Sequence, residues 1–100
     1  MPLTADRKKA LRTLGHNLKP IVTIGDKGLS EGVMEELERA LNDHELIKVK
    51  LAVNERDVRK ELIAELCKAS GAELVQEIGK IALILRKAEK PNARLSNLLR

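Results

Sequence analysis

The chain contains no phenylalanine, tryptophan or tyrosine among its 100 residues. A hydrophobic core must therefore consist of aliphatic side chains, which are plentiful because 43% of the residues are hydrophobic. The same absence excludes nucleic-acid binding modes in which bases stack on aromatic rings, apart from contacts made by the two histidines.

Cysteine and long apolar runs are also scarce. Cys67 is the only cysteine, so no intramolecular disulfide can form, which fits a reducing compartment. The longest unbroken apolar run, 81–85, is far too short to span a bilayer. Residues 1–4 lack the apolar run of a signal peptide. We therefore expect a cytoplasmic protein without a membrane partner.

The net charge of +4 is unevenly distributed along a chain whose length suits one domain. Residues 29–46 hold six acidic residues and one basic residue, whereas each remaining part of the chain has a basic excess. A polyanion is expected to avoid the acidic segment and to contact the rest of the surface. Plain solubility is the alternative explanation for so modest a net charge.

Apolar periodicity predicts an α/β fold of the two-layer type, in the order α-β-α-β-α-β-β. The expected helices cover 4–17, 30–43 and 55–70, and the expected strands cover 21–24, 46–53, 73–78 and 80–87. The strands should form a four-stranded mixed sheet that ends in an antiparallel hairpin. The second and third helices should cover one face of the sheet. The first strand reads as apolar on both sides, so the other face should also be partly covered, and the first helix is the candidate.

The stretch 20–31 reads as a short buried strand, a Gly-x-x-Gly loop and the start of a helix capped by Ser30. Free amides and the positive end of a helix dipole are suited to holding an anion, most often a phosphate. Lys27 adds a positive charge inside the loop, and Asp26 opposes it. The alternative is an ordinary turn in which Gly25 and Gly28 only form the corner.

The helix over 4–17 has Thr4 as a possible N-cap and is expected to bury one side made of Ala10, Leu11, Leu14 and Leu18. The opposite arc of the helix is basic and holds Lys8, Lys9 and Arg12. This basic face is either simply solvated or contacts a polyanion. Gly15 and His16 are expected to end this helix.

The strand over 46–53 alternates, with Ile47, Val49, Leu51 and Val53 pointing one way. Lys48 and Lys50 point the other way, about 7 Å apart, close to the phosphate spacing of a nucleic-acid strand. The alternative is that these lysines are simply the hydrated side of a sheet.

Further along, Asn54 is the expected N-cap of the third helix, whose apolar stripe includes Ala69, and Gly71 is its expected C-terminal glycine. Gly32 in the second helix would let another backbone approach closely. Residues 88–100 read as a basic tail whose leucines could dock, with Lys90, Arg94, Leu95, Leu98, Leu99 and Arg100.

No arrangement typical of an enzyme is apparent. His16, His44 and Cys67 form no catalytic or metal-binding set by spacing, and there is no Walker loop or cysteine pair. We expect neither catalysis nor a cofactor, metal or small-molecule substrate, and a monomer is the default expectation.

Residues 18–33 together with 44–50 and with Ile78, Gly79 and Lys80 resemble the CRM domain family (chloroplast RNA splicing and ribosome maturation), in its stand-alone YhbY-like form. The resemblance covers about residues 3–87, and residues 88–100 are not part of it. It implies a fold similar to the C-terminal domain of translation initiation factor 3. It also implies a Gly-x-x-Gly loop that clamps an RNA backbone, and association with ribosomal RNA in precursors of the large ribosomal subunit.

Residues and resemblance together predict a single RNA-binding domain over 1–87 and a tail over 88–100. The expected RNA contacts are Gly25, Asp26, Lys27 and Gly28 in the loop, then Lys48, Lys50, Lys8, Lys9 and Arg12, with Lys19 and Lys80 as lesser candidates. The alternative is a protein-binding module that docks on a ribosomal protein through the acidic helix over 30–43 and the tail.

Overall fold

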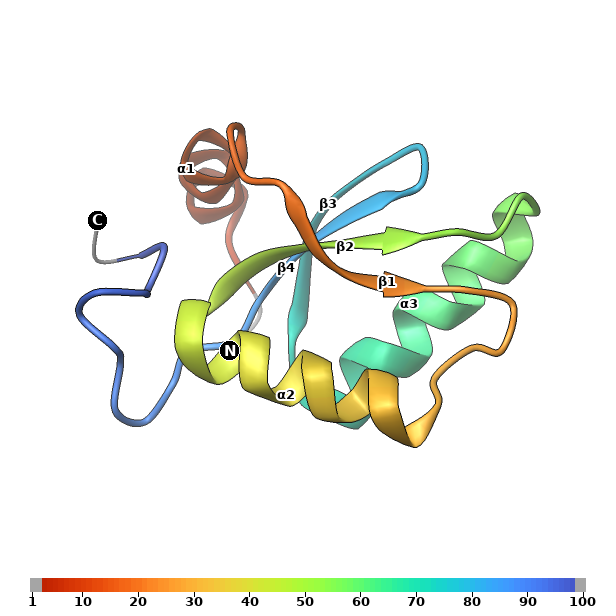
Figure 1. Ribbon diagram of the computed structural model, residues 1–100. Helices are drawn as coiled ribbons and strands as arrows, with labels where there is room; N and C mark the ends of the chain where they lie inside the picture. The colour runs from red at the N-terminus through yellow and green to blue at the C-terminus, as the bar shows by residue number, and fades with distance from the viewer. Residues whose placement is uncertain (1–2, 99–100) are drawn as a thin grey trace.

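The computed structural model describes residues 3–98, which form three helices and four strands (Figure 1). The elements are α1 (Ala5–Gly15), β1 (Pro20–Ile24), α2 (Glu31–His44), β2 (Leu46–Leu51), α3 (Arg56–Ser70), β3 (Glu73–Ile78) and β4 (Ile81–Leu85). The predicted order of helices and strands is confirmed.

The strands form one mixed sheet in the order β1-β2-β4-β3. Strand β1 runs parallel to β2, whereas β4 is antiparallel to both β2 and β3. Helices α2 and α3 lie on one face of the sheet and α1 lies on the other (Figure 1). The mixed sheet, its terminal hairpin and the shared face of α2 and α3 are as predicted.

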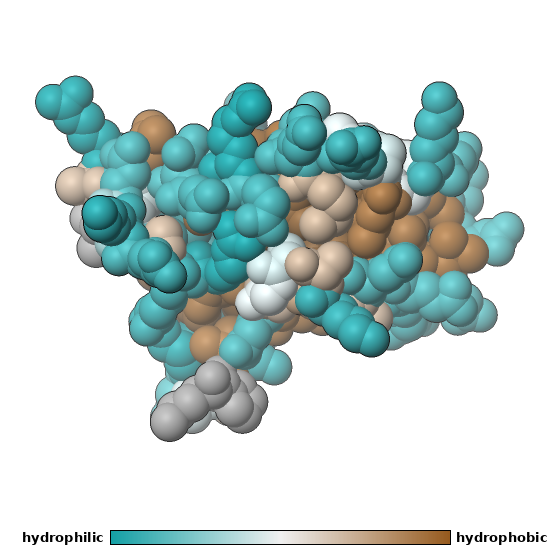
Figure 2. Space-filling model, turned by 90° about the horizontal axis from the view of Figure 1, so that it is seen from below, coloured by the Kyte–Doolittle hydropathy of each residue, from teal (hydrophilic) through white to brown (hydrophobic). Residues whose placement is uncertain are grey.

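The larger core lies between the sheet and helices α2 and α3. The inward side chains of β2 are buried as the alternation predicted, and they meet Leu37 and Leu41 of α2 and Leu66 of α3. Leu29, Val33, Met34 and Leu62 pack at the edge of this core and stay partly exposed. Figure 2 shows hydrophobic surface on this side of the molecule, bordered by hydrophilic side chains.

A smaller core lies between α1 and the other face of the sheet. It consists of Leu11, Leu46, Val75, Leu83 and Leu85. Helix α1 covers this second face as expected, but it packs against β2 and β3 and not over the first strand, which had suggested the cover. Strand β1 lies at the edge of the sheet, next to β2.

The side of α1 that packs on the sheet also differs from the prediction. The helix buries Leu11 and Gly15, one turn apart, whereas Leu14 is 42% exposed and Ala10 is exposed. A Cβ atom added at Gly15 would lie 2.8 Å from both terminal carbons of Leu83. Gly15 therefore lets α1 approach β4 closely. The prediction missed this because apolar periodicity does not count glycine among the residues that mark a buried side.

Strand β1 carries an irregularity that exposes an apolar side chain. Its register with β2 shifts between Pro20 and Val22, so Ile21 is the extra residue of a bulge. Ile21 is 50% exposed, and the expectation that this strand is apolar and buried on both faces is wrong. A bulge also makes an edge strand a poorer template for pairing with another chain.

The helix caps are partly as predicted. The hydroxyls of Thr4 and Ser30 accept from the amides of Arg7 and Val33 at 3.1 and 3.2 Å, and Gly71 ends α3 with a φ of 76°. Asn54 does not cap α3, which begins after Glu55 without a side-chain cap. The Asn54 side-chain oxygen Oδ1 instead accepts from the Lys80 ammonium at 2.8 Å.

Three smaller expectations are also wrong. Ala69 is exposed, so it is not part of the buried stripe of α3. A Cβ atom added at Gly32 would meet no atom within 4 Å, so no other backbone approaches there. Strand β4 ends at Leu85 and not at residue 87. The guanidinium of the next residue, Arg86, binds the Glu38 carboxylate at 2.8 Å and the Ser70 carbonyl oxygen at 2.8 Å.

The described part of the tail, 88–98, packs onto the junction between α2 and β2. The Glu45 carboxylate is 2% exposed; it accepts from the Ser96 hydroxyl at 2.6 Å and from the Ala88 amide at 2.8 Å. The Asn97 side-chain amide donates to the Leu46 carbonyl at 2.6 Å. Truncation after residue 87 would remove these hydrogen bonds and the packing of Leu98 on the small core, so it should destabilise the domain. Leu99 and Arg100 lie outside the described residues.

Between residues 3 and 98, no helix is long and apolar enough to cross a membrane.

The Gly15 contact leads to a prediction about stability. Gly15→Ala should lower the free energy of unfolding by about 1–2 kcal/mol, because crowding against the buried Leu83 outweighs the gain in helix propensity. Gly32→Ala is the matched control in open space and should be neutral or stabilising by roughly 0.5 kcal/mol. Urea denaturation of both variants measures the difference. An unfolding free energy of Gly15→Ala equal to the wild-type value would contradict the proposed close packing.

Candidate nucleic-acid interface

Two adjoining hollows lie on the α1 side of the sheet. One is lined by His16, Leu18, Pro20, Lys48, Gln76, Ile78, Ile81 and Leu83, and the other by Lys9, Arg12, Thr13, His16, Asn17, Gln76 and Ile78. Because His16, Gln76 and Ile78 line both, the hollows form one continuous depression, which we call the α1-side trough. None of the residues that line it is acidic.

Lys48 lines one of the two hollows and contacts the end of α1. Its side chain projects from the outward face of β2, and its ammonium donates to the His16 carbonyl at the end of α1 at 3.2 Å. A cation beside the carbonyl end of a helix is electrostatically favourable. The contact joins β2 to the end of α1, the helix that carries Arg12 and Lys9 on its preceding turns.

Lys50 extends the basic surface along β2. It is exposed and pairs across the sheet with Thr23 of β1 and Ile81 of β4. Because side chains two residues apart share a face of a strand, Lys48 and Lys50 point to the same side. The basic residues therefore lead from the trough toward the end of the sheet where β1 meets the glycine loop.

Gln76 and Ile78 were not identified from the sequence, and a β-bulge explains why. The register of β3 with β4 shifts between Leu74 and Gln76. Val75 and Gln76 consequently both face α1, with Val75 in the small core and Gln76 in the trough. Strict alternation would assign these neighbours to opposite faces, so no sequence signal pointed to Gln76.

Apolar side chains form part of the trough floor and rim. Ile78 is 65% exposed at the tip of the hairpin, and Leu18, Pro20 and Ile81 line the same hollow. In a chain without aromatic residues, these aliphatic groups are the apolar surface available to a sugar or a base. His16, which the sequence indicated as a helix-end residue with RNA contact as the lesser alternative, lines both parts of the trough.

The Gly-x-x-Gly loop forms a closed turn. The Gly28 amide donates to the Gly25 carbonyl at 3.0 Å, and Gly28 has a φ of 68°, which favours glycine. Asp26 and Lys27 are exposed at the tip. The amides of Gly28 and Val33 already have protein acceptors, so the loop offers fewer free amides than the sequence suggested.

Gly25 differs from Gly28 because the fold does not require a glycine there. Its φ is not positive, and a Cβ atom added at Gly25 would meet no atom within 4 Å. The absent side chain leaves open space beside the loop backbone. This space is what a close approach by a ligand backbone would use.

Hydrogen bonds hold the loop to its neighbours at this end of the sheet. The Ala52 amide donates to the Ile24 carbonyl at 2.7 Å, directly before the loop. The Arg59 guanidinium donates to the carbonyls of Val53 and Asn54 at 2.8 and 2.7 Å. Lys80 belongs to the same network through Asn54. The loop is thus anchored to the connection that follows β2 and to the turn of the hairpin.

The structure therefore brings together some of the predicted contacts and separates others. Lys9, Arg12 and Lys48 line the trough, and Lys50 continues it. The loop and Lys80 lie at the end of the sheet, outside the trough lining. Lys19 lines a separate hollow that it shares with Lys48, and Lys8 is half-buried and lines neither part of the trough.

Of the three side chains considered for catalysis, Cys67 and His44 do not line the trough, whereas His16 does. Within the described residues, no group of three or more His, Cys, Asp or Glu side chains could hold a metal ion. Burial, followed by the charge of Glu73, raises the pKa of the Cys67 thiol, which leaves less of the nucleophilic thiolate at neutral pH. His44 contacts the Leu95 carbonyl oxygen through Nδ1 at 2.9 Å. Cys67 packs against the larger core, and this position together with the raised pKa of its thiol fits a packing role.

Comparisons with known proteins identify the family. The sequence profile of the CRS1 / YhbY (CRM) domain matches residues 3–86. A probable RNA-binding protein of Pseudomonas aeruginosa is 58% identical over 100 residues, covering 100% of this chain and 96% of that protein. An RNA-binding protein of Haemophilus influenzae is 41% identical over 93 residues, covering 93% of this chain and 94% of that protein.

A solved structure shows the same fold. The solution structure of a Staphylococcus aureus protein, described as hypothetical and as a candidate RNA binder, aligns with a TM-score of 0.78 at 39% identity. The alignment covers 89% of this chain and 93% of that chain.

Proposed function

This chain belongs to the CRS1 / YhbY (CRM) domain family, and on that basis we propose that it binds RNA through the α1-side trough and the Gly25–Gly28 loop. The observation that carries the proposal is the convergence of cations on one surface. Lys9 and Arg12 from α1 and Lys48 from β2 line a trough without acidic residues, and Lys50 extends it. The names of the relatives, which describe RNA-binding proteins, support the same ligand.

The contacts proposed are mainly to the RNA backbone. Lys48 and Lys50 lie about 7 Å apart along one strand face, which suits successive phosphates. Ile78 and Leu18 offer aliphatic surface to riboses, and the open space at Gly25 admits a backbone at the loop. Such binding depends strongly on salt and only modestly on sequence.

We further propose that the RNA is ribosomal RNA in a precursor of the large ribosomal subunit, so that the protein acts as a non-catalytic assembly factor in the cytoplasm. The support for this step is the family resemblance carried by 18–33 and 44–50. The charge distribution is compatible with it, because the acidic exposed side chains Glu31, Glu35 and Glu36 lie on α2, on the face of the sheet opposite to the trough. RNA can therefore approach the trough without meeting them.

A protein-binding module that uses α2 and the tail is the alternative function. The tail is less suited to this role than its sequence suggested, because Ser96 and Asn97 already bind Glu45 and Leu46 of the same chain. Leu98 packs against the small core. Under this alternative, substitutions in the trough would leave the binding of ribosomal components unchanged.

The first test is the double variant Arg12→Gln, Lys50→Gln. Both side chains are exposed and have no partner among residues 3–98, so the substitutions should leave folding intact. Loss of two phosphate contacts should reduce the slope of log K against log salt by about 1.4 on single-stranded RNA. Fluorescence anisotropy with a ribosomal RNA fragment across a salt series measures the slope.

The matched control is Arg39→Gln, Lys68→Gln, which removes one arginine and one lysine from the exposed surfaces of α2 and α3. It lowers the net charge equally but lies on the other face of the sheet. Equal slopes for the two double variants would mean that the protein's overall charge, and not the trough, attracts RNA.

Gly25→Ala tests the loop separately from charge. The added methyl group has open space, so the free energy of unfolding should change by less than roughly 0.5 kcal/mol. If an RNA backbone approaches the loop at Gly25, affinity should nevertheless fall severalfold in the anisotropy assay. Unchanged affinity and stability would show that the loop is only a turn.

A further inference from the structure

A second basic hollow lies on the other flank of α1, outside all the contacts proposed above. Its lining includes Leu3, Arg7, Glu73, Leu85 and Lys87, which come from three distant parts of the chain. We propose that Arg7 and Lys87 form a second RNA phosphate site, so that bound RNA passes over α1 from the trough to this hollow. The proposal rests on the proposed RNA-binding function.

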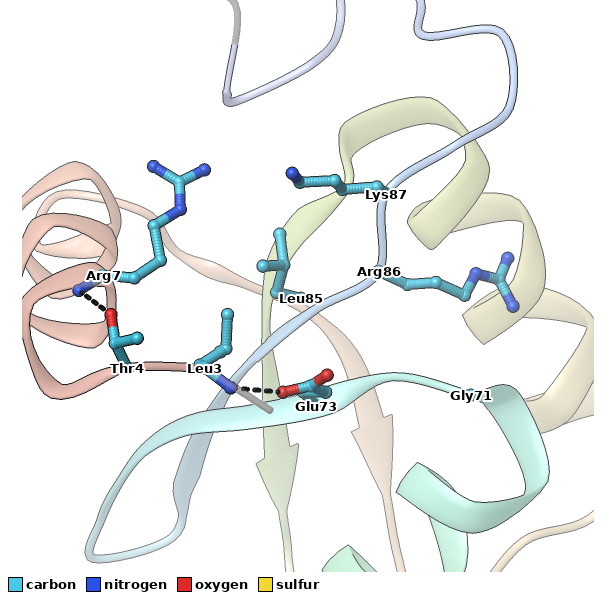
Figure 3. Close-up of a pocket in the computed structure, with 8 residues that line it drawn as sticks. All are labelled: Leu3, Thr4, Arg7, Gly71, Glu73, Leu85, Arg86 and Lys87. Carbon is cyan, nitrogen blue, oxygen red and sulfur yellow. Dashed lines mark hydrogen bonds between the residues drawn. The ribbon is translucent and has the colours of Figure 1, made fainter. Parts of the chain in front are cut away.

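The two cations converge although they are far apart in sequence. Figure 3 shows the Arg7 side chain extending from α1 and the Lys87 side chain extending toward it from the segment that follows β4. Both residues are exposed, and within the described chain neither head group has a hydrogen-bond or ion-pair partner. Two unpaired cations that face one opening are suited to an anion with several acceptor oxygens.

The other charged residues that line the hollow, Arg86 and Glu73, already have hydrogen-bond partners. Arg86 also lines the hollow, but its guanidinium points away toward α2, where it binds Glu38 at 2.8 Å and Asn42 at 3.0 Å. Glu73 accepts from the Leu3 amide at 3.2 Å. Figure 3 shows its carboxylate at the opposite end of the hollow from the two cationic head groups. An anion would therefore meet Arg7 and Lys87 at the rim, away from Glu73.

The apolar residues between them suit a nucleotide. Leu3 and Leu85 lie between the cations and Glu73, and Leu85 is 5% exposed. A ribose could pack on these side chains while its phosphate binds Arg7 and Lys87. An acidic peptide is the other polyanion that two cations could attract, and the test below distinguishes it from RNA.

Helix α1 connects this hollow to the trough. Arg7 faces the hollow, whereas Lys9 and Arg12 on the same helix line the trough. A helix with its side chains is about 10 Å across, a width that a single RNA strand can cross within a few nucleotides. RNA long enough to use both flanks would thus contact cations on both sides of α1.

The experiment compares Arg7→Gln, Lys87→Gln with the matched control Arg39→Gln, Lys68→Gln in the full-length protein. Neither Arg7 nor Lys87 belongs to a core cluster, so the melting temperature should stay at the wild-type value. With a long single-stranded ribosomal RNA fragment, the salt slope should fall by about 1.4, which corresponds to roughly tenfold weaker binding at 0.15 M salt. The control should bind as the wild type does.

RNA length provides the second arm. The short RNA is the shortest fragment whose affinity still falls in the Arg12→Gln, Lys50→Gln variant. Because this fragment fills the trough alone, the Arg7→Gln, Lys87→Gln variant should bind it with the same affinity as the wild type. Wild-type affinity of this variant for the long RNA would overturn the inference while the proposed function stands, and would leave an acidic peptide as the ligand to test. If wild-type protein binds no RNA at all, both the function and the inference fail.

Discussion

The close contact of α1 with the sheet at Gly15 is the constraint on which the rest of the structure depends. Strands β2 and β4 are central and carry apolar side chains on both faces, so both faces must be covered. Without aromatic residues, α1 has Leu11 as its one large buried side chain, and Gly15 brings the helix down onto Leu83. This approach places His16 where its carbonyl meets Lys48, and the trough forms around that contact.

The two faces of the sheet consequently have different roles. The face under α2 and α3 holds the larger core and carries the acidic helix. The face under α1 is only partly covered, which leaves Lys48, Lys50 and Gln76 accessible around the end of the helix. Under the proposed function, this separation of charge would orient the α1 side of the molecule toward RNA, because the acidic α2 lies on the far side.

Local sequence signals predicted the elements and their order well. Alternation in 46–53 gave the buried face of β2 correctly, and Thr4, Ser30 and Gly71 are at the helix ends as expected. Strand alternation and helix caps depend on residues within a few positions of one another in the sequence, so local sequence patterns can predict them. The basic character of one strand face at Lys48 and Lys50 followed from the same alternation.

The features that the sequence did not predict all depend on distant partners. The burial of Gly15 is a consequence of Leu83, and the bulge at Val75 that turns Gln76 into the trough depends on the register with β4. Glu45 directly follows α2 and is buried, and its carboxylate accepts hydrogen bonds from Ser96 and Ala88 of the tail, which are more than forty residues away. Arg7 and Lys87 are eighty positions apart in the sequence, and only the fold brings them to one hollow.

The central claim is that RNA lies on the α1 side of the sheet, and amide chemical-shift mapping by NMR tests it most directly. Titration of the labelled protein with a ribosomal RNA fragment should shift the amides of Arg12 to Asn17, Lys48 to Ala52 and Gln76 to Ile81. The exposed face of α2 should stay unchanged. Shifts confined to α2 and the tail, with none around His16 and Lys48, would contradict the account and place the binding surface on the acidic side of the molecule.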